Sequence, residues 1–294
     1  MSAEKNNFTW PEYELVDTGG FEKLERFGEY YVARPEPQAL WDKSMPESEW
    51  KKLVSTRFRT DKGATDKGEW FRFQGMPSNW EIPYRHDNMS LKFQLGLSSF
   101  KHVGLFPEQA YNWNYIFEKT LSLRVKKPKV LNLFAYTGGA SLAAKAGGAD
   151  VTHVDSVKQV ISWANRNMVL SGLKDIRWVA EDAVKFVRRE VKRGNRYNGV
   201  ILDPPAYGRG PRGEKWMLAK CLNDLVKDCL KLLAESNMFF VINVYSMGLS
   251  HLVLENLISE SGRKGIKTES GELCLKDRSG KKLPLGVFSR FSDV

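Results

Sequence analysis

Residues 130–139 read Val130-Leu131-Asn132-Leu133-Phe134-Ala135-Tyr136-Thr137-Gly138-Gly139, and this stretch indicates the class of fold most directly. Its first five residues form a short apolar run, which is typical of a buried strand. A turn with two glycines follows, and glycine lets the backbone approach a ligand closely. The glycine spacing differs from the G-x-G-x-x-G pattern of a dinucleotide-binding loop. The stretch therefore predicts a strand that ends in a tight turn at a ligand site.

The same pattern repeats along the rest of the chain. Further apolar runs predict strands at residues 150–155, 176–180, 199–202 and 238–242. The segments between them carry apolar residues at helical spacing, as in Leu218, Leu222 and Leu225. Repeated strand–helix units form a parallel sheet with helices on both faces. Residues 272–276 and 287–291 predict an antiparallel C-terminal hairpin, so the expected fold class is α/β with a mostly parallel sheet.

The first hundred residues have a different character. Short aromatic runs such as Trp70-Phe71-Arg72-Phe73 alternate with glycine, proline and asparagine, which is typical of short strands. We therefore predict two domains. A small strand-rich domain at residues 1–100 is a candidate for substrate binding, and a larger α/β domain occupies residues 101–294.

The composition is that of an ordinary soluble protein, with 42% apolar and 27% charged residues in 294. No apolar run approaches the ~20 residues that span a bilayer, and the polar N-terminus lacks a signal-peptide core, so we expect a cytoplasmic protein and no membrane partner. The net charge of +10 favours a polyanionic partner such as nucleic acid, although a lysine-rich enzyme surface would also account for it. The three cysteines and four histidines lack metal-ligand spacing, which predicts no metal site.

Acidic residues follow two of the predicted strands. Ligands of open parallel sheets bind outside the carboxyl ends of the strands, where Asp155 and Asp182 are expected. Asp155 could accept hydrogen bonds from both ribose hydroxyls of an adenosine, and Asp182 could accept one from the adenine amine. Each could instead cap the helix that follows it. The two acids together favour an adenosine-bearing cofactor.

The most specific motif is Asp203-Pro204-Pro205, which follows the fourth predicted strand. Two prolines restrict the backbone and remove two N–H donors, so the carboxylate and the carbonyls act as acceptors for a planar amino group. The ring of Tyr207 could stack on a flipped base, and Asn243 could assist from the next strand. The alternative is a strand-ending turn with structural prolines.

These motifs resemble those of a known family. Residues 130–138, 154–156, 181–183 and 202–205 are similar to the motifs of class I S-adenosylmethionine-dependent methyltransferases, in particular those related to the large-subunit ribosomal RNA cytosine-C5 and guanine-N7 enzymes. Residues 104–109 resemble the segment that precedes the cofactor domain of the family. The resemblance extends from about residue 30 to residue 294 and implies a Rossmann-like sheet.

The resemblance also implies a cofactor, S-adenosylmethionine, and a set of residues that hold it. The expected cofactor-binding residues are Phe106, Gln109, Phe134, Tyr136, Thr137, Gly138, Asp155, Ser156, Asp182, Ala183 and Asp203. The expected reaction centre consists of Asp203, Pro204, Pro205 and Tyr207.

Two departures from the family pattern affect the expected substrate. Many relatives carry an N-terminal PUA RNA-binding domain, for which we find no room beside the smaller domain. Cytosine-C5 enzymes need a cysteine thiolate after the Pro-Pro motif or at the end of the fifth strand, where this chain has Ala206-Tyr207 and Asn243-Val244-Tyr245-Ser246. We therefore predict methyl transfer to a base nitrogen in RNA, with ribosomal RNA as the expected substrate. The alternatives are a small-molecule or protein substrate, or a non-catalytic RNA-binding factor on the same fold.

Overall fold

The computed structural model describes residues 10–63, 67–73, 75–210, 213–245, 248–259 and 267–294. The chain packs into two compact units. The larger contains residues 109–273 and 286–294, and the smaller contains residues 3–108 and 274–285. These limits describe packing, whereas the domain division that we predicted at residue 100 concerns independently folding segments and stays a prediction.

A seven-stranded sheet forms the centre of the larger unit, in the order β10-β9-β8-β11-β14-β16-β15. The strands are β8 (Lys129–Leu133), β9 (Asp150–Asp155), β10 (Ile176–Ala180), β11 (Gly199–Leu202), β14 (Phe239–Val244), β15 (Thr268–Lys276) and β16 (Lys282–Ser292). The first five strands of this order are parallel to one another, and β16 is antiparallel to β14. The structure therefore confirms the predicted Rossmann-like sheet with its C-terminal hairpin.

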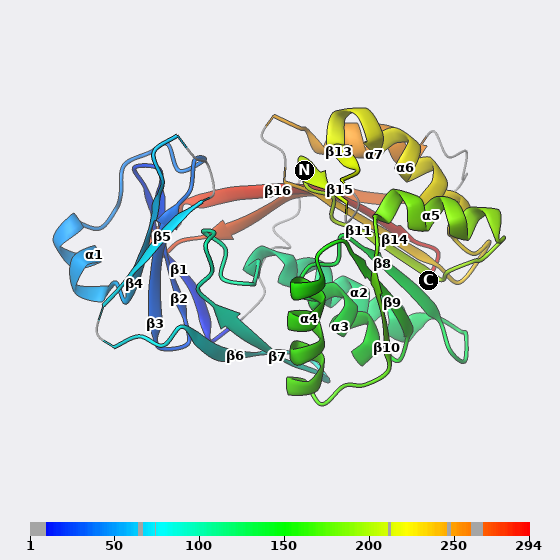
Figure 1. Cartoon of the computed structure of the whole chain (residues 1–294), viewed down its shortest axis with the longest axis horizontal. Coiled ribbons are helices and arrows are strands. Elements are labelled where there is room, and N and C mark those ends of the chain that lie inside the picture. Colours follow the sequence, from blue (N-terminus) through cyan, green and yellow to red (C-terminus); the bar gives the residue numbers. More distant parts are fainter. Residues whose placement is uncertain (1–9, 64–66, 74, 211–212, 246–247, 260–266) are drawn as a thin grey trace. The chain divides into compact units, whose positions relative to one another are not determined.

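Helices cover both faces of this sheet (Figure 1). One face carries α2 (Ala110–Ser122), α3 (Gly139–Ala146) and α4 (Lys158–Leu170), and the other carries α5 (Ala183–Lys192), α6 (Leu218–Leu232) and α7 (His251–Ser259). Fully buried residues such as Leu131, Phe186, Val226 and Phe240 fill the layer between sheet and helices. Each contributes about 1.5–3 kcal/mol by leaving water. Within the described ranges, no helix is both long enough and apolar enough to cross a membrane.

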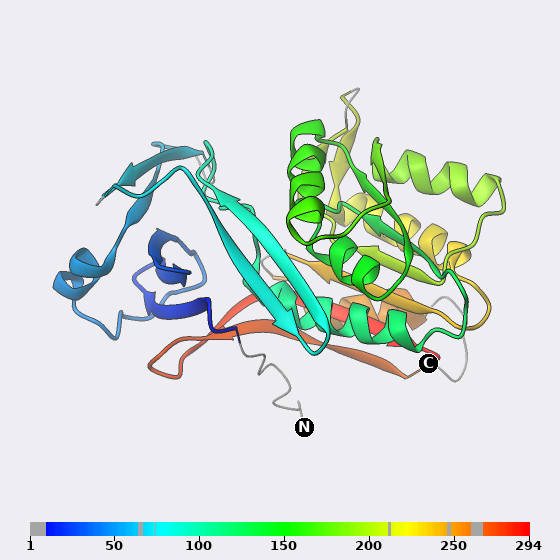
Figure 2. The same ribbon diagram turned by 90° about the horizontal axis from the view of Figure 1, so that it is seen from below.

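The smaller unit is rich in strands, as predicted. Its five-stranded sheet runs in sequence order through β1 (Tyr13–Gly19), β2 (Glu22–Phe27), β3 (Tyr30–Pro35), β4 (Thr56–Thr60) and β5 (Gly68–Arg72). The β3–β4 pair is parallel because the short helix α1 (Glu47–Leu53) connects these strands, and the other pairs are antiparallel. A separate long hairpin, β6 (Asn79–His86) with β7 (Met89–Gly96), lies outside this sheet (Figure 2).

Polar contacts hold the tip of the C-terminal hairpin within the smaller unit. The Thr18 hydroxyl donates a 2.7 Å hydrogen bond to the Asp277 carboxylate, and both residues are buried. Arg278 donates two hydrogen bonds of 2.8 Å to the Glu14 carboxylate. Bidentate pairs of this kind fix geometry as well as adding energy. Because of these contacts, a segment near the C-terminus packs with strands from the N-terminus.

Candidate functional site

The turn after β8 has an unusual backbone. Phe134 and Tyr136 adopt positive φ angles of 54° and 48°, and Gly138, at the start of α3, adopts 94°. Positive φ is rare and strained for bulky residues, and such strain is typical of functional sites. A Cβ atom at the next residue, Gly139, would lie 2.6 Å from the ring of Trp113, so this position requires glycine. The local sequence therefore forms a tight turn at the carboxyl end of β8.

Asp155, at the end of β9, holds this turn. Its carboxylate accepts hydrogen bonds from the backbone amides of Tyr136 at 3.0 Å and Val157 at 2.9 Å. The following helix begins at Lys158 without a side-chain cap, so the structure does not support helix capping as the role of Asp155. Burial raises the pKa of the carboxyl group, and the amide hydrogen bonds oppose this shift. A carboxylate has about four acceptor sites, so this one can also accept from ribose hydroxyls.

Asp182 does cap a helix. Its Oδ1 atom accepts a 2.9 Å hydrogen bond from the amide of Lys185 in the first turn of α5, which confirms the capping alternative. The amide of the preceding residue, Glu181, donates to the carbonyl of Asp155 at 3.0 Å, so the ends of β9 and β10 are joined. Capping occupies one carboxylate oxygen and is compatible with a hydrogen bond from the adenine amine to the other.

Asp203, at the end of β11, has a side chain among the groups that hold it. Asn243 on the neighbouring strand β14 donates a 3.0 Å hydrogen bond from Nδ2 to Oδ1 of Asp203. Asn243 is 2% exposed, and its Oδ1 atom has no hydrogen-bond partner among the described residues. Leaving a buried acceptor unpaired costs about 1–3 kcal/mol. The reversed amide would place oxygen against carboxylate, so the orientation with Nδ2 toward Asp203 is the favoured one, and it leaves Oδ1 available to a donor.

A small hairpin follows the Pro-Pro motif and contains a residue that sequence reasoning missed. Strand β12 (Tyr207–Arg209) pairs with β13 (Lys215–Met217), although the glycine-rich and basic composition of residues 208–216 favours a loop. Trp216, in β13, donates from Nε1 to the carbonyl of Pro205 at 2.6 Å, and its ring centroid lies 5.1 Å from that of Phe134. It therefore connects the motif after β11 to the turn after β8. The signal available in the sequence was a tryptophan within a glycine-rich, basic segment, because an aromatic residue of this size usually packs against other side chains.

The remaining predicted site residues are placed as follows. Gln109 donates from Nε2 to the hydroxyl of Tyr245 at 3.0 Å and accepts from Asn112 at 3.0 Å, so it links the start of α2 to the residue after β14. Tyr245 was not identified from the sequence. Phe106 belongs to the smaller unit, where its ring lies 5.4 Å from that of His102. Its contact with a cofactor stays a prediction.

Other predicted positions differ in exposure. Tyr207 is 74% exposed and Pro205 is exposed, whereas Pro204 is buried. Thr137 and Ala183 are buried and Ser156 is half-buried. The exposed ring of Tyr207 suits stacking on a base, but its role, like the other assigned roles, stays a prediction. Across the described ranges, no group of three or more His, Cys, Asp or Glu residues could hold a metal ion.

A buried polar chain lies beneath the turn after β8. The amide of Asn132 donates to the Ser141 hydroxyl at 2.9 Å, and this hydroxyl lies 3.0 Å from Nδ1 of His153. Burial lowers the pKa of His153 to about 3, so the imidazole is neutral at physiological pH. This neutral network links β8, α3 and β9 under the proposed cofactor turn.

Comparison with known proteins identifies the family. The family model for S-adenosylmethionine-dependent methyltransferases matches residues 38–263. The crystal structure of such an enzyme from Agrobacterium tumefaciens is 36% identical, with a TM-score of 0.89, over 98% of this chain and 92% of that one. A Streptococcus mutans protein described as a methyltransferase of the same class shares the fold, at 16% identity and a TM-score of 0.69, over 95% of this chain and 75% of its own. The chain belongs to the S-adenosylmethionine-dependent methyltransferase family.

Curated relatives match only part of the chain. The ribosomal RNA large subunit methyltransferase K/L of Shewanella frigidimarina is 30% identical over 149 residues, which make up 49% of this chain and 20% of that protein. The enzyme of the same name from Shewanella baltica is 34% identical over 147 residues, 49% of this chain and 19% of its own length. The matched region is therefore about a fifth of these relatives.

The site fits the cofactor that the family uses. S-adenosylmethionine carries an adenosine, and Asp155 and Asp182 lie at the ends of β9 and β10, which a backbone hydrogen bond joins beside the strained turn after β8. The Oδ1 acceptor of Asn243 lies on β14, which is separated from β8 by β11. The protein is thus a methyltransferase enzyme that depends on S-adenosylmethionine.

Proposed function

We propose that this enzyme transfers a methyl group to a nitrogen atom of a base in RNA, with ribosomal RNA as the substrate. The observation that carries the proposal is the pair formed by Asp203 and Asn243, in which a carboxylate is held by an amide whose own oxygen is buried and unpaired among the described residues. An amino or ring N–H group supplies the donor that such acceptors require.

The side chains divide into two roles under this proposal. Asp155 and Asp182 bind the adenosine, and the turn through Gly138 approaches it closely. When bound, the cofactor supplies an electrophilic methyl group on its sulfonium. Asp203 and the carbonyl of Pro204 accept hydrogen bonds from the base nitrogen, so that its lone pair faces the methyl group at short distance. Such positioning supplies much of the rate in a displacement of this kind, and under this proposal the Asp203 carboxylate accepts the proton lost by the nitrogen.

The positions of the cysteines argue against methylation of a ring carbon. Cys221 and Cys229 lie on α6, and Cys274 lies in β15. Burial raises the pKa of the Cys229 thiol well above its usual value, which opposes formation of a thiolate. The C5 reaction needs a thiolate at the ends of β11 or β14, where the sequence has none.

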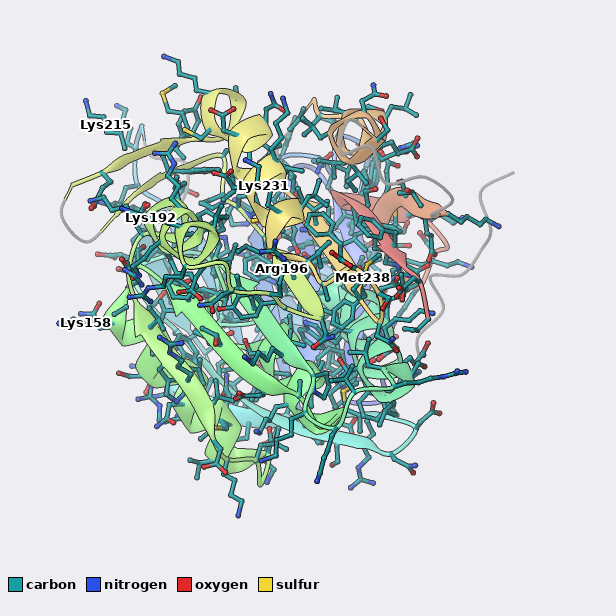
Figure 3. All side chains as sticks on the ribbon, turned by 90° about the vertical axis from the view of Figure 1, so that its right-hand side faces the viewer. Lys158, Lys192, Arg196, Lys215, Lys231 and Met238 are labelled. Atoms are coloured by element: carbon teal, nitrogen blue, oxygen red, sulfur yellow. The ribbon has the colours of Figure 1, made fainter. Side chains whose placement is uncertain are left out.

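Two observations favour RNA over a small molecule. The net charge is +10, and Figure 3 shows Lys192, Arg196 and Lys231 projecting from one face of the larger unit. Basic surfaces bind phosphate backbones by releasing counterions. The names of the curated relatives point to ribosomal RNA as well.

The test uses the whole protein, isotopically labelled S-adenosylmethionine and ribosomal RNA from cells that lack the gene. Digestion to nucleosides followed by mass spectrometry should show one N-methylated nucleoside, which is also missing from RNA of the deletion strain. Label on a pyrimidine C5 atom, or only on a protein or a small molecule, would contradict the proposal. Cofactor binding without any labelled product would favour a non-catalytic RNA-binding factor.

A further inference from the structure

One face at the edge of the smaller unit presents unusually many exposed aromatic rings. Phe71 in the edge strand β5 is 38% exposed, and Phe73, just after it, is 43% exposed. The amide of Phe73 continues the strand pairing through a 2.7 Å hydrogen bond to the carbonyl of Ser55. Side chains two residues apart along a strand share a face, about 7 Å apart. Two phenylalanine rings therefore stand side by side on one face.

The same face continues beyond the other end of β5. Lys67, just before the strand, pairs directly with Phe100 of another segment, so these two side chains also share a face. Phe100 is 43% exposed. By strand alternation Lys67 lies on the face of Phe71, which extends the row to three phenylalanines and a lysine. Monomers rarely gather exposed apolar side chains without a function, so this row is a candidate binding surface.

Cations accompany the aromatic rings. Arg57 and Arg59 of β4 lie on this face, since Arg57 pairs with Phe71 and Arg59 with Glu69 across the two strands. The guanidinium of Arg59 lies over the ring of Phe71, 4.4 Å from its centroid. Glu69 also lies on this face, and Arg57 pairs with the carboxylate of Glu47 at 2.9 Å, but residues 51–73 contain seven lysines and arginines against three acids. The face, which we call the β5 strip (Arg57, Arg59, Lys67, Phe71, Phe73 and Phe100), is thus both aromatic and basic.

We propose that the β5 strip binds single-stranded RNA by stacking bases on Phe71 and Phe73, with Arg59 and Lys67 contacting phosphates. This inference rests on the proposed RNA substrate and adds where a part of that substrate binds. Common RNA-binding modules likewise use aromatic side chains on a sheet surface to stack two or three bases. The positive charge favours a polyanion over an apolar protein segment as the occupant.

The experiment measures fluorescence anisotropy of the full chain with a labelled 12-nucleotide oligouridylate and with a 12-base-pair RNA duplex. Stacking is worth about 1–3 kcal/mol per base, so the double variant Phe71→Ala/Phe73→Ala should bind the single strand at least about tenfold more weakly. Duplex binding should change little. The variant Arg59→Gln should reduce the salt dependence of binding by about one counterion.

Two further variants distinguish stacking from apolar contact and from the loss of any exposed ring. Phe71→Leu/Phe73→Leu keeps apolar surface without a π face and should bind as weakly as the alanine variant. Phe21→Ala removes a phenylalanine that is 58% exposed on the turn between β1 and β2, and should bind normally. Thermal unfolding and the cofactor dissociation constant should remain at wild-type values in all variants, which excludes misfolding.

Unchanged single-strand binding in the alanine variant would overturn the β5 strip, as would full binding by the leucine variant, which would indicate apolar docking of a protein. An equal loss in Phe21→Ala would also overturn it. These failures would leave RNA methylation by the wild-type enzyme intact. Failure of the proposed function is distinguished by wild-type enzyme that labels no RNA nitrogen.

Discussion

Asp155 and Asp203 both end parallel strands of one sheet, but their carboxylates are held in different ways. Asp155 accepts from backbone amides, among them those of Tyr136 and Val157. Asp203 accepts from the side chain of Asn243, whose oxygen remains buried without a partner among the described residues. The first arrangement uses backbone amides, those of the strained turn and of the start of α4, and the second includes a side-chain amide.

This difference separates a common function from a specific one. Backbone amides orient the acid that we assign to the cofactor, which all members of the family share. Side-chain atoms surround the acid that we assign to the acceptor, which differs among methyltransferases. A site with these two halves can keep its cofactor while its substrate changes through a few side chains.

The largest expected effect comes from Asp203, the acid that we assign to the acceptor. Asp203→Ala should lower the methylation rate about 10²–10³-fold, because it removes the acceptor that orients the nitrogen and takes its proton. Asp203 is also one of the expected cofactor-binding residues, but if its main role is at the acceptor, the dissociation constant for S-adenosylmethionine should stay within about threefold, since Asp155 and the turn remain. Rates measured with labelled cofactor and calorimetric binding test both statements. Equal losses in rate and in cofactor affinity would show that Asp203 does not act on the acceptor separately from the cofactor.

The stability of the protein should depend on pH through His153, which lies in the buried network near the turn after β8. The pKa of His153 is about 3 in the folded protein and about 6.5 in the unfolded chain. At a pH between these values the unfolded chain binds a proton that the folded protein does not, which lowers the free energy of unfolding. This contribution to stability is complete above pH 6.5 and is lost progressively between pH 6.5 and pH 3. From pH 7 to pH 5 it amounts to about 2 kcal/mol.

The variant His153→Gln keeps hydrogen-bonding capacity without titrating. Its free energy of unfolding in urea should therefore fall by about 2 kcal/mol less than that of the wild type between pH 7 and pH 5. An identical pH dependence for the two proteins would show that His153 does not control the stability of this region.

Asp155→Ala tests the cofactor assignment itself. Loss of hydrogen bonds from two ribose hydroxyls to a charged acceptor should weaken S-adenosylmethionine binding about 10–100-fold. Isothermal titration calorimetry measures the affinity, and the Asp203→Ala protein serves as the matched carboxylate control. Unchanged affinity in Asp155→Ala would remove Asp155 from the cofactor site.

The smallest effect is expected at Asp182, where capping and cofactor binding coincide. Asp182→Ser keeps a good N-cap for α5 and removes the longer charged acceptor, so stability should stay within about 0.5 kcal/mol. Cofactor affinity should fall about fivefold if the second oxygen receives the adenine amine. Asp182→Ala should in addition lose about 1 kcal/mol of stability. Normal affinity in the serine variant would leave capping as the only role of Asp182.

Local patterns predicted most of the larger unit. The strands at residues 150–155, 176–180 and 199–202 have the predicted bounds, because each apolar run is flanked by turn or polar residues. The acids that we assign to the cofactor were selected for the same reason, since Asp155 ends one such run and Asp182 comes two residues after another, and their roles stay predictions. Contacts between segments far apart in the sequence could not be predicted from these local patterns. The hydrogen bond from Gln109 to Tyr245 joins residues 136 apart, and no local pattern announces it.

The hairpin that contains Trp216 shows the same limit. Glycines and basic residues at 208–216 favour a loop, whereas pairing between β12 and β13 is stabilised by the contacts of Trp216 with Pro205 and Phe134. Those partners come from the ends of two different strands. Propensity is a weak guide wherever tertiary contacts of this kind outweigh it.

Short-range order in the chain was sufficient to establish a mostly parallel α/β sheet, its C-terminal hairpin and the acids at its strand ends, because apolar periodicity and turn residues act over a few positions. What each acid contacts was decided by strand order. Asp155 meets the turn after β8 because β8 and β9 are neighbours, and Asp203 meets Asn243 because β11 and β14 are neighbours. Hydrogen bonds act over about 3 Å, so only the folded sheet could bring these partners together and distinguish the two halves of the site.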